Sequence, residues 1–123
     1  MLAGPLVAYE EGGGGEVVNI YLVVVRNLRT GRVIREVPTG TLSTPKPGWV
    51  GIGPTTGIVL KSDGAVAWIA ETGFPMNYEV HAVDNNGSRV LATGSDIDPS
   101  SLALADETIY WTAGSTAMSA PLN

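Results

Sequence analysis

The 123-residue sequence contains no cysteine and a single histidine, His81. The absence of cysteine excludes disulfides, thiolate nucleophiles and thiolate metal sites, and one histidine cannot form a histidine-rich zinc site within a single chain. Charged residues make up only 15% of the chain, with 7 basic against 12 acidic residues and a net charge of −5. This balance disfavours binding to nucleic acid through a basic surface. No apolar run reaches the roughly 18 residues of a spanning helix, so no membrane partner is expected.

Glycine and proline, in contrast, are abundant, with 16 and 8 residues, and apolar residues make up 44% of the chain. Glycine or proline interrupts almost every window that could hold three helical turns. The chain has instead short runs rich in Val, Ile, Tyr and Trp, and these residue types favour strands. The sequence therefore predicts an all-β, antiparallel chain. The ten expected strands are residues 6–10, 17–26, 32–37, 57–61, 65–71, 78–83, 89–93, 101–105, 108–112 and 116–121.

The sequence also contains an internal repeat. Residues 57–70 resemble residues 101–113, because each segment is an apolar strand, an acidic turn and a second strand with a tryptophan near its centre. The two tryptophans, Trp68 and Trp111, therefore occupy equivalent places and are expected to lie in the core. A third copy of the second strand begins at Pro5 and has Tyr9 in the tryptophan position.

A second pair of similar segments, residues 23–34 and 80–91, completes the repeat as a unit of four strands, A to D. A repeated four-stranded antiparallel meander of about 40–45 residues is typical of a β-propeller blade. The chain then reads as B-C-D, a full A-B-C-D and a final A-B-C, or about two and a half blades. The single repeat region 1–123 is thus divided into a partial blade 1–56, a full blade 57–100 and a partial blade 101–123.

A family resemblance follows from the final repeat. Tyr110, Trp111 and Thr112, within residues 104–113, resemble the motif of the Tyr-Trp-Thr-Asp class of β-propellers, although the closing Asp of that motif is Ala113 here. The segment is also similar to the TolB-like and WD-like blades of bacterial exported proteins. The resemblance covers residues 57–122 and, more loosely, 5–40. It implies an extracytoplasmic parent protein, although the first residues of this chain do not read as a secretory signal.

The number of strands raises the question of how the ring closes. Propellers have roughly four to eight blades, and a pair of isolated blades would expose apolar faces and unpaired strand edges. Three outcomes are open: a piece of a longer protein, a flattened sandwich, or a homo-oligomer that completes the ring through blade faces and edge strands. The incomplete end units favour the homo-oligomer, because repeats need to be capped.

Three residues are candidates for binding. Glu79 and His81 share one face of their strand because side chains alternate with a period of two, and a carboxylate beside a histidine can orient a general base. No nucleophile motif accompanies this pair, so a solvated strand face is the favoured interpretation. Trp49, in a proline-rich connection, could stack on a sugar, anchor a peptide or pack beneath its own loop. No catalytic residue is assigned.

Two further patterns receive simpler interpretations. Asp96, Asp98 and Ser100 have the alternating oxygens of a calcium loop, but Ser101 stands where such a loop needs glycine, and a turn between units is favoured. No metal site or cofactor is therefore expected. The arginines of residues 26–35 cluster around one hairpin, where a solvated face is the simplest reading.

These observations favour a non-enzymatic propeller-type module that serves as a binding or assembly scaffold, with a protein or carbohydrate as the ligand. The alternatives are a structural fragment of a longer exported propeller, a propeller hydrolase or lyase, and a glycan-binding, lectin-like module. Fold does not determine function, and the choice depends on the site.

Overall fold

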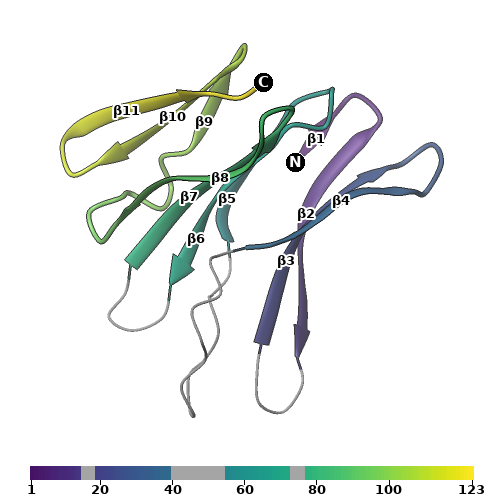
Figure 1. Cartoon of the computed structure of the whole chain (residues 1–123), viewed down its shortest axis with the longest axis horizontal. Helices are drawn as coiled ribbons and strands as arrows, with labels where there is room; N and C mark the ends of the chain where they lie inside the picture. Colours follow the sequence, from purple (N-terminus) through teal and green to yellow (C-terminus); the bar gives the residue numbers. More distant parts are fainter. Residues whose placement is uncertain (15–18, 40–54, 73–76) are drawn as a thin grey trace.

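The computed structural model describes residues 1–14, 19–39, 55–72 and 77–123, and these residues form three small antiparallel sheets (Figure 1). The first sheet contains β1 (Leu2–Ala3), β2 (Leu6–Gly14), β3 (Asn19–Asn27) and β4 (Val33–Pro38). The middle sheet contains β5 (Thr55–Leu60), β6 (Val66–Thr72), β7 (Asn77–Asp84) and β8 (Gly87–Gly94). The last sheet contains β9 (Ala103–Ala105), β10 (Thr108–Ala113) and β11 (Thr116–Pro121). The all-β, antiparallel prediction is confirmed.

Within each sheet the strands follow one another in chain order, as in a meander. The strands can therefore be lettered A to D as in the sequence repeat, and both β1 to β4 and β5 to β8 form complete sets. Among the described residues, the last sheet has A, B and C strands and no D strand. Sheets of four, four and three strands are consistent with blade-like units, and closure into a ring is not seen among the described residues.

The first sheet differs from the expectation, because it has an A strand that the sequence reading missed. Strand β1 pairs with β2 at Leu2–Val7 and Ala3–Leu6, and the chain reverses through Gly4 and Pro5. Gly4 has a φ of 57°, and proline fixes a negative φ, so the pair fits a type II′ turn. A strand of two residues is too short to give a periodic signal, which explains why the first unit was expected to lack it.

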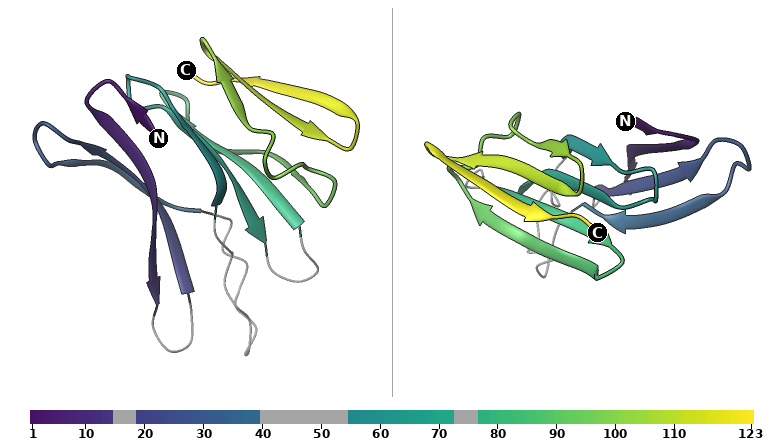
Figure 2. Two further views of the ribbon diagram at one scale, coloured as in Figure 1. Left: turned by 180° about the vertical axis from the view of Figure 1, so that it is seen from behind. Right: turned by 90° about the horizontal axis from the view of Figure 1, so that it is seen from above.

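The middle sheet lies between the other two and is covered on both faces (Figures 1 and 2). Every residue of β6 from Val66 to Ala70 is buried. Because side chains alternate, Ala67 and Ile69 pack toward the last sheet, whereas Trp68 and its even-numbered neighbours pack toward the first. A strand sandwiched in this way reads as a continuous apolar run.

Two interfaces therefore hold the three sheets together. The first interface joins the middle sheet, with Leu60, Val66, Trp68, Ala70 and Val83, to Leu6, Ala8, Val23 and Val25 of the first sheet. The second interface joins its other face, with Val59, Ala65, Ala67, Ile69, Val80 and Ala82, to Ile97, Ile109, Trp111 and Leu122.

The repeated aromatic residue points in the same direction in all three sheets. Trp68 faces the first sheet, and Trp111 faces the middle sheet, so each tryptophan packs on the sheet that precedes it in the chain. Tyr9 lies on the opposite face of β2 from Leu6 and Ala8, which pack on the middle sheet. Tyr9 therefore occupies the outer face of the first sheet, on the side where a preceding sheet would lie.

The C-terminal segment is fastened to the middle sheet. Leu122 is buried in the second interface, and its amide donates a hydrogen bond of 2.8 Å to the Glu107 carbonyl. The last three carbonyls accept hydrogen bonds from side chains of the middle unit. Arg89 donates to the carbonyl of residue 121 (2.7 Å), Lys61 to that of residue 122 (2.8 Å) and Asn85 to that of residue 123 (2.9 Å).

Asp84 is the centre of this attachment. Its side chain is fully buried and pairs with Arg89 at 2.7 and 3.1 Å, while Oδ2 also accepts the Asn123 amide at 2.7 Å and Oδ1 accepts the Asn86 amide at 2.8 Å. These hydrogen bonds, with that from Arg89 the most important, lower the pKa of Asp84 to about 2.

This depressed pKa predicts how the stability depends on pH. Asp84 titrates lower in the folded protein than in the unfolded chain, so its contribution is present above pH ~4 and is lost as the pH falls through about 2. The difference corresponds to about 2 kcal/mol of unfolding free energy. Urea titrations at several pH values should show that Asp84→Asn abolishes this part of the acid dependence.

Asp106→Asn is the matched control, because Asp106 is exposed and Asn tolerates its φ of 53°. The control should keep the acid dependence of the unmodified chain. An Asp84→Asn chain with the same acid dependence as the unmodified chain would contradict the role of the carboxylate.

Candidate functional site

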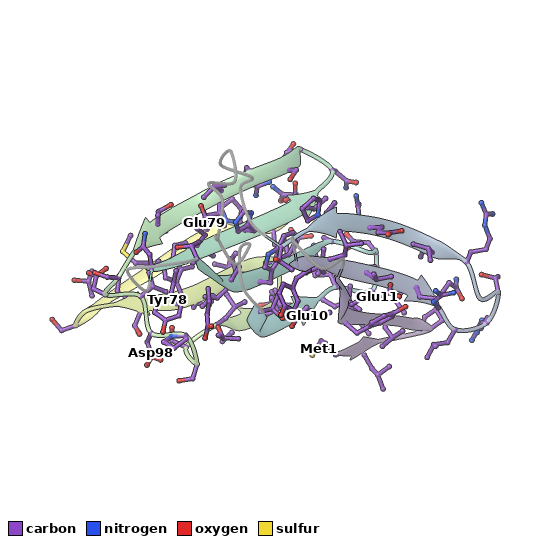
Figure 3. All side chains as sticks on the ribbon, turned by 90° about the horizontal axis from the view of Figure 1, so that it is seen from below. Met1, Glu10, Glu11, Tyr78, Glu79 and Asp98 are labelled. Atoms are coloured by element: carbon purple, nitrogen blue, oxygen red, sulfur yellow. The ribbon has the colours of Figure 1, made fainter. Side chains whose placement is uncertain are left out.

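The structure brings two of the three candidate binding residues together. Glu79 and His81 both lie on the face of β7 that packs toward the first sheet, as the period of two predicts. Figure 3 labels Glu79 and its neighbour Tyr78, which lies on the opposite side of the sheet. Trp49 lies outside the described residues.

Strand pairing positions the histidine ring. His81 on β7 is directly opposite Trp68 on β6, and the two rings stack with centroids 5.2 Å apart and planes within 4°. His81 Nε2 lies 3.2 Å from Glu79 Oε1, within hydrogen-bond distance. The stack and the carboxylate together fix the orientation of the imidazole.

The predicted solvated face is wrong. His81 is 6% exposed and Glu79 is 8% exposed. The physical reason is that the first sheet covers the face of Glu79 and His81, while the last sheet covers the other face, with Val80 and Ala82. Strand β7 therefore has two buried faces rather than one. Alternation along a strand predicts which side chains share a face, but it does not reveal that a second sheet covers the polar one.

Trp68 adds a hydrogen bond across the first interface. Its indole Nε1 donates to the Thr39 carbonyl at 2.6 Å, just after β4 of the first sheet. The sequence identified Trp68 as a core residue but gave no sign of this contact. Trp111 Nε1 differs, because it is buried without a hydrogen-bond partner among the described residues.

Other polar contacts also connect the first and middle sheets. Glu10 Oε2 accepts hydrogen bonds from Thr55, from the amide at 3.2 Å and from the hydroxyl at 2.9 Å. At the other end of the interface, Arg35 Nε donates to the Gly64 carbonyl at 2.9 Å. Figure 3 shows Glu10 close to the middle sheet, whereas Glu11 lies toward the far side of β2. The His81–Glu79 pair therefore lies within the middle sheet, at an apolar interface that also contains polar links to the first sheet.

This geometry suits a structural role better than catalysis. A general base must reach the proton that it removes, but the imidazole is stacked on Trp68 and buried between two sheets. A buried polar group is stable when its partners are present, and the carboxylate at 3.2 Å supplies one for the imidazole.

The calcium-like segment forms a turn between sheets, as favoured from the sequence. Asp98 Oδ1 accepts hydrogen bonds from the Ser100 amide at 2.9 Å and hydroxyl at 2.8 Å, and these bonds lower the pKa of Asp98. Ser101 Oγ donates to the Asp98 carbonyl at 2.7 Å. Within the described part of the chain, no group of three or more His, Asp or Glu side chains is placed to hold a metal ion.

The arginine cluster is only partly a solvated face. Arg29 and Arg32 are exposed, as expected. Arg26 Nε instead donates to the Tyr9 hydroxyl at 3.2 Å, and Arg35 makes the contact with Gly64 described above.

Helices long and apolar enough to cross a membrane are absent from the described ranges.

The difference between the two tryptophans can be tested by matched substitutions. Trp68→Phe removes the hydrogen bond to Thr39, whereas Trp111→Phe removes a buried donor that lacks a partner in the described structure. Both remove the same volume, so Trp68→Phe should cost about 1–2 kcal/mol more unfolding free energy than Trp111→Phe. Urea unfolding of both variants measures the difference, and equal losses would show that the Trp68 hydrogen bond contributes nothing.

Comparison with family models, with curated proteins and with solved structures finds no significant match for this chain. No family model therefore supports the resemblance to the Tyr-Trp-Thr-Asp class of β-propellers. The chain is an all-β protein with three small antiparallel sheets, and no family is identified.

Proposed function

We propose that this chain is a non-enzymatic assembly or binding scaffold that self-associates by repeating its own sheet-on-sheet packing. The outer face of the first sheet in one copy would pack on the outer face of the last sheet in another. The observation that supports this most is the common direction of Tyr9, Trp68 and Trp111, each facing the side of the preceding sheet. Only for Tyr9 is no such sheet present among the described residues.

The outer face of the first sheet is suited to packing. Tyr9 is paired with Val24 across β2 and β3, and Val24 is already buried. Val7 and Leu22 lie on the same face, because they are two residues from Tyr9 and Val24 along β2 and β3 and side chains alternate between the faces. Arg26 Nε donates a hydrogen bond to the Tyr9 hydroxyl. Glu11, Arg26 and Glu36 lie on this face as well, because they are opposite Leu22, Val7 and Val24. The face therefore combines apolar and charged side chains, as non-obligate interfaces do.

The outer face of the last sheet carries small and uncharged side chains. Ile109 and Trp111 pack inward, so Tyr110 between them faces outward and is 45% exposed. Ala117 and Ser119 lie on the same face of the neighbouring β11. Small side chains also occur at Ala67 and Ala82 on the corresponding face of the middle sheet, against which the last sheet packs.

A structural fragment of a longer propeller is the second candidate, because further sheets of a parent chain could cover the same two outer faces. The catalytic and glycan-binding alternatives receive no support from the described residues. Glu79 and His81 are buried, and Trp49 lies outside the described part of the chain.

Head-to-tail complementation tests this function directly. Tyr9→Arg places a charge on one outer face and Tyr110→Arg places a charge on the other, so each should reduce self-association at least about tenfold. An equimolar mixture should form a 1:1 heterodimer, because each variant keeps the face that the other has lost. Light scattering coupled to size-exclusion chromatography at micromolar concentrations measures these masses.

Leu28→Arg is the control, because Leu28 is an exposed apolar residue at the tip of the β3–β4 hairpin. It should associate like the unmodified chain. A clean monomer of the unmodified chain at micromolar concentration would refute the proposal, and so would an equimolar mixture that stays monomeric.

A further inference from the structure

In the part of the chain that the structure describes, strand β11 has an open edge where the other two sheets have a fourth strand. The C strands β3 and β7 are covered by β4 and β8, whereas β11 pairs only with β10 in the described structure. Strand pairing makes Val24, His81 and Met118 equivalent, because they lie opposite Tyr9, Trp68 and Trp111. The exposed fractions are 1% for Val24, 6% for His81 and 39% for Met118. The apolar Met118 side chain is thus exposed beside the missing strand.

The hairpin fixes which backbone groups face that edge. Ala113 and Thr116 flank a two-residue turn, in which Gly114 has a φ of 62°. Such a turn makes the flanking residues a hydrogen-bonded pair, and every second residue of β11 then bonds to β10. The hydrogen bond from the Leu122 amide continues this series. The residues between, at 117 and 119, therefore direct their N–H and C=O groups to the open edge.

The edge also lacks the charges that commonly protect such strands. Strand β4 carries Arg35 and Glu36, and β8 carries Arg89, whereas β11 has no charged residue from Thr116 to Pro121. Inward or flanking charges on edge strands prevent edge-to-edge pairing. The proline at the end of β11 removes one outward N–H, but the N–H groups of residues 117 and 119 are retained.

We infer that β11 pairs antiparallel with β11 of a second copy of this chain, around a two-fold axis at Met118. Ala117 of each copy then lies opposite Ser119 of the other, and these two pairs make four backbone hydrogen bonds. The two Met118 side chains meet at the axis and cover each other. No like charges face one another across it, because β11 has none. The orientation matches that of β8 on β7.

This contact is separate from the face-to-face packing under Proposed function, because it uses backbone groups at one edge and leaves the outer face of the first sheet untouched. The two can therefore fail independently. The tests below use chains that also carry Tyr9→Arg, which removes the face-to-face contact. In the same way, the complementation of Tyr9→Arg with Tyr110→Arg is measured in chains that also carry Met118→Lys, which removes the edge contact.

Cysteine substitution tests the position of the axis. The chain has no cysteine, so Met118→Cys introduces one thiol per copy. Met118 of the two copies would form a non-hydrogen-bonded pair with Cα atoms about 4.5 Å apart, within the range that a disulfide bridges. In a glutathione redox buffer, Met118→Cys should give covalent dimers at least about tenfold faster than Ser62→Cys, an exposed control in a turn.

Charge complementation tests the pairing without a covalent bond. Met118→Lys and Met118→Glu should each sediment as monomers, because like charges would meet at the axis, and an equimolar mixture should form a heterodimer. Circular dichroism checks that both variants remain folded. Equal crosslinking rates for Met118→Cys and Ser62→Cys would overturn the proposal. A Met118→Lys and Met118→Glu mixture that sediments as monomers would overturn it as well.

Discussion

The structure depends on the middle sheet having two apolar faces, both of which must be covered. Strand β6 is buried along Val66 to Ala70, and neither face could be exposed to water without a large loss of stability. The first sheet covers one face through Leu6, Ala8, Val23 and Val25, and the last sheet covers the other through Ile109 and Trp111. Each outer sheet is therefore held mainly by its contact with the middle one.

Directional polar contacts give these apolar interfaces a fixed geometry. Trp68 donates to the Thr39 carbonyl, and the C-terminal segment is held by Arg89 and Asp84. The two interfaces are not identical, because the indole N–H of Trp111 has no partner in the described part of the chain. Since the same kind of packing occurs twice within one chain, its continuation between copies would be a physical basis for the scaffold function that we propose.

The sequence predicted the strands that have apolar runs and glycine turns between them, such as the β7–β8 hairpin, whose turn leads into Gly87. It missed β1, because Leu2–Ala3 is too short for any periodic signal. It also placed Glu79 and His81 on one face correctly, but it predicted that this face was solvated. A local pattern cannot show which distant strand covers a face, and the Thr39 carbonyl has no side-chain signal that would identify it as an acceptor.

Hydrogen exchange of the backbone amides tests the central claim most directly, because protection reports the coverage of each strand. The account predicts that amides of β6 and β7 exchange most slowly and only through global unfolding, while those of β9 to β11 exchange faster through local opening of the last sheet. If β6 and β7 exchange as fast as β10 and β11, the middle sheet is not the sandwiched element on which the rest of the structure depends.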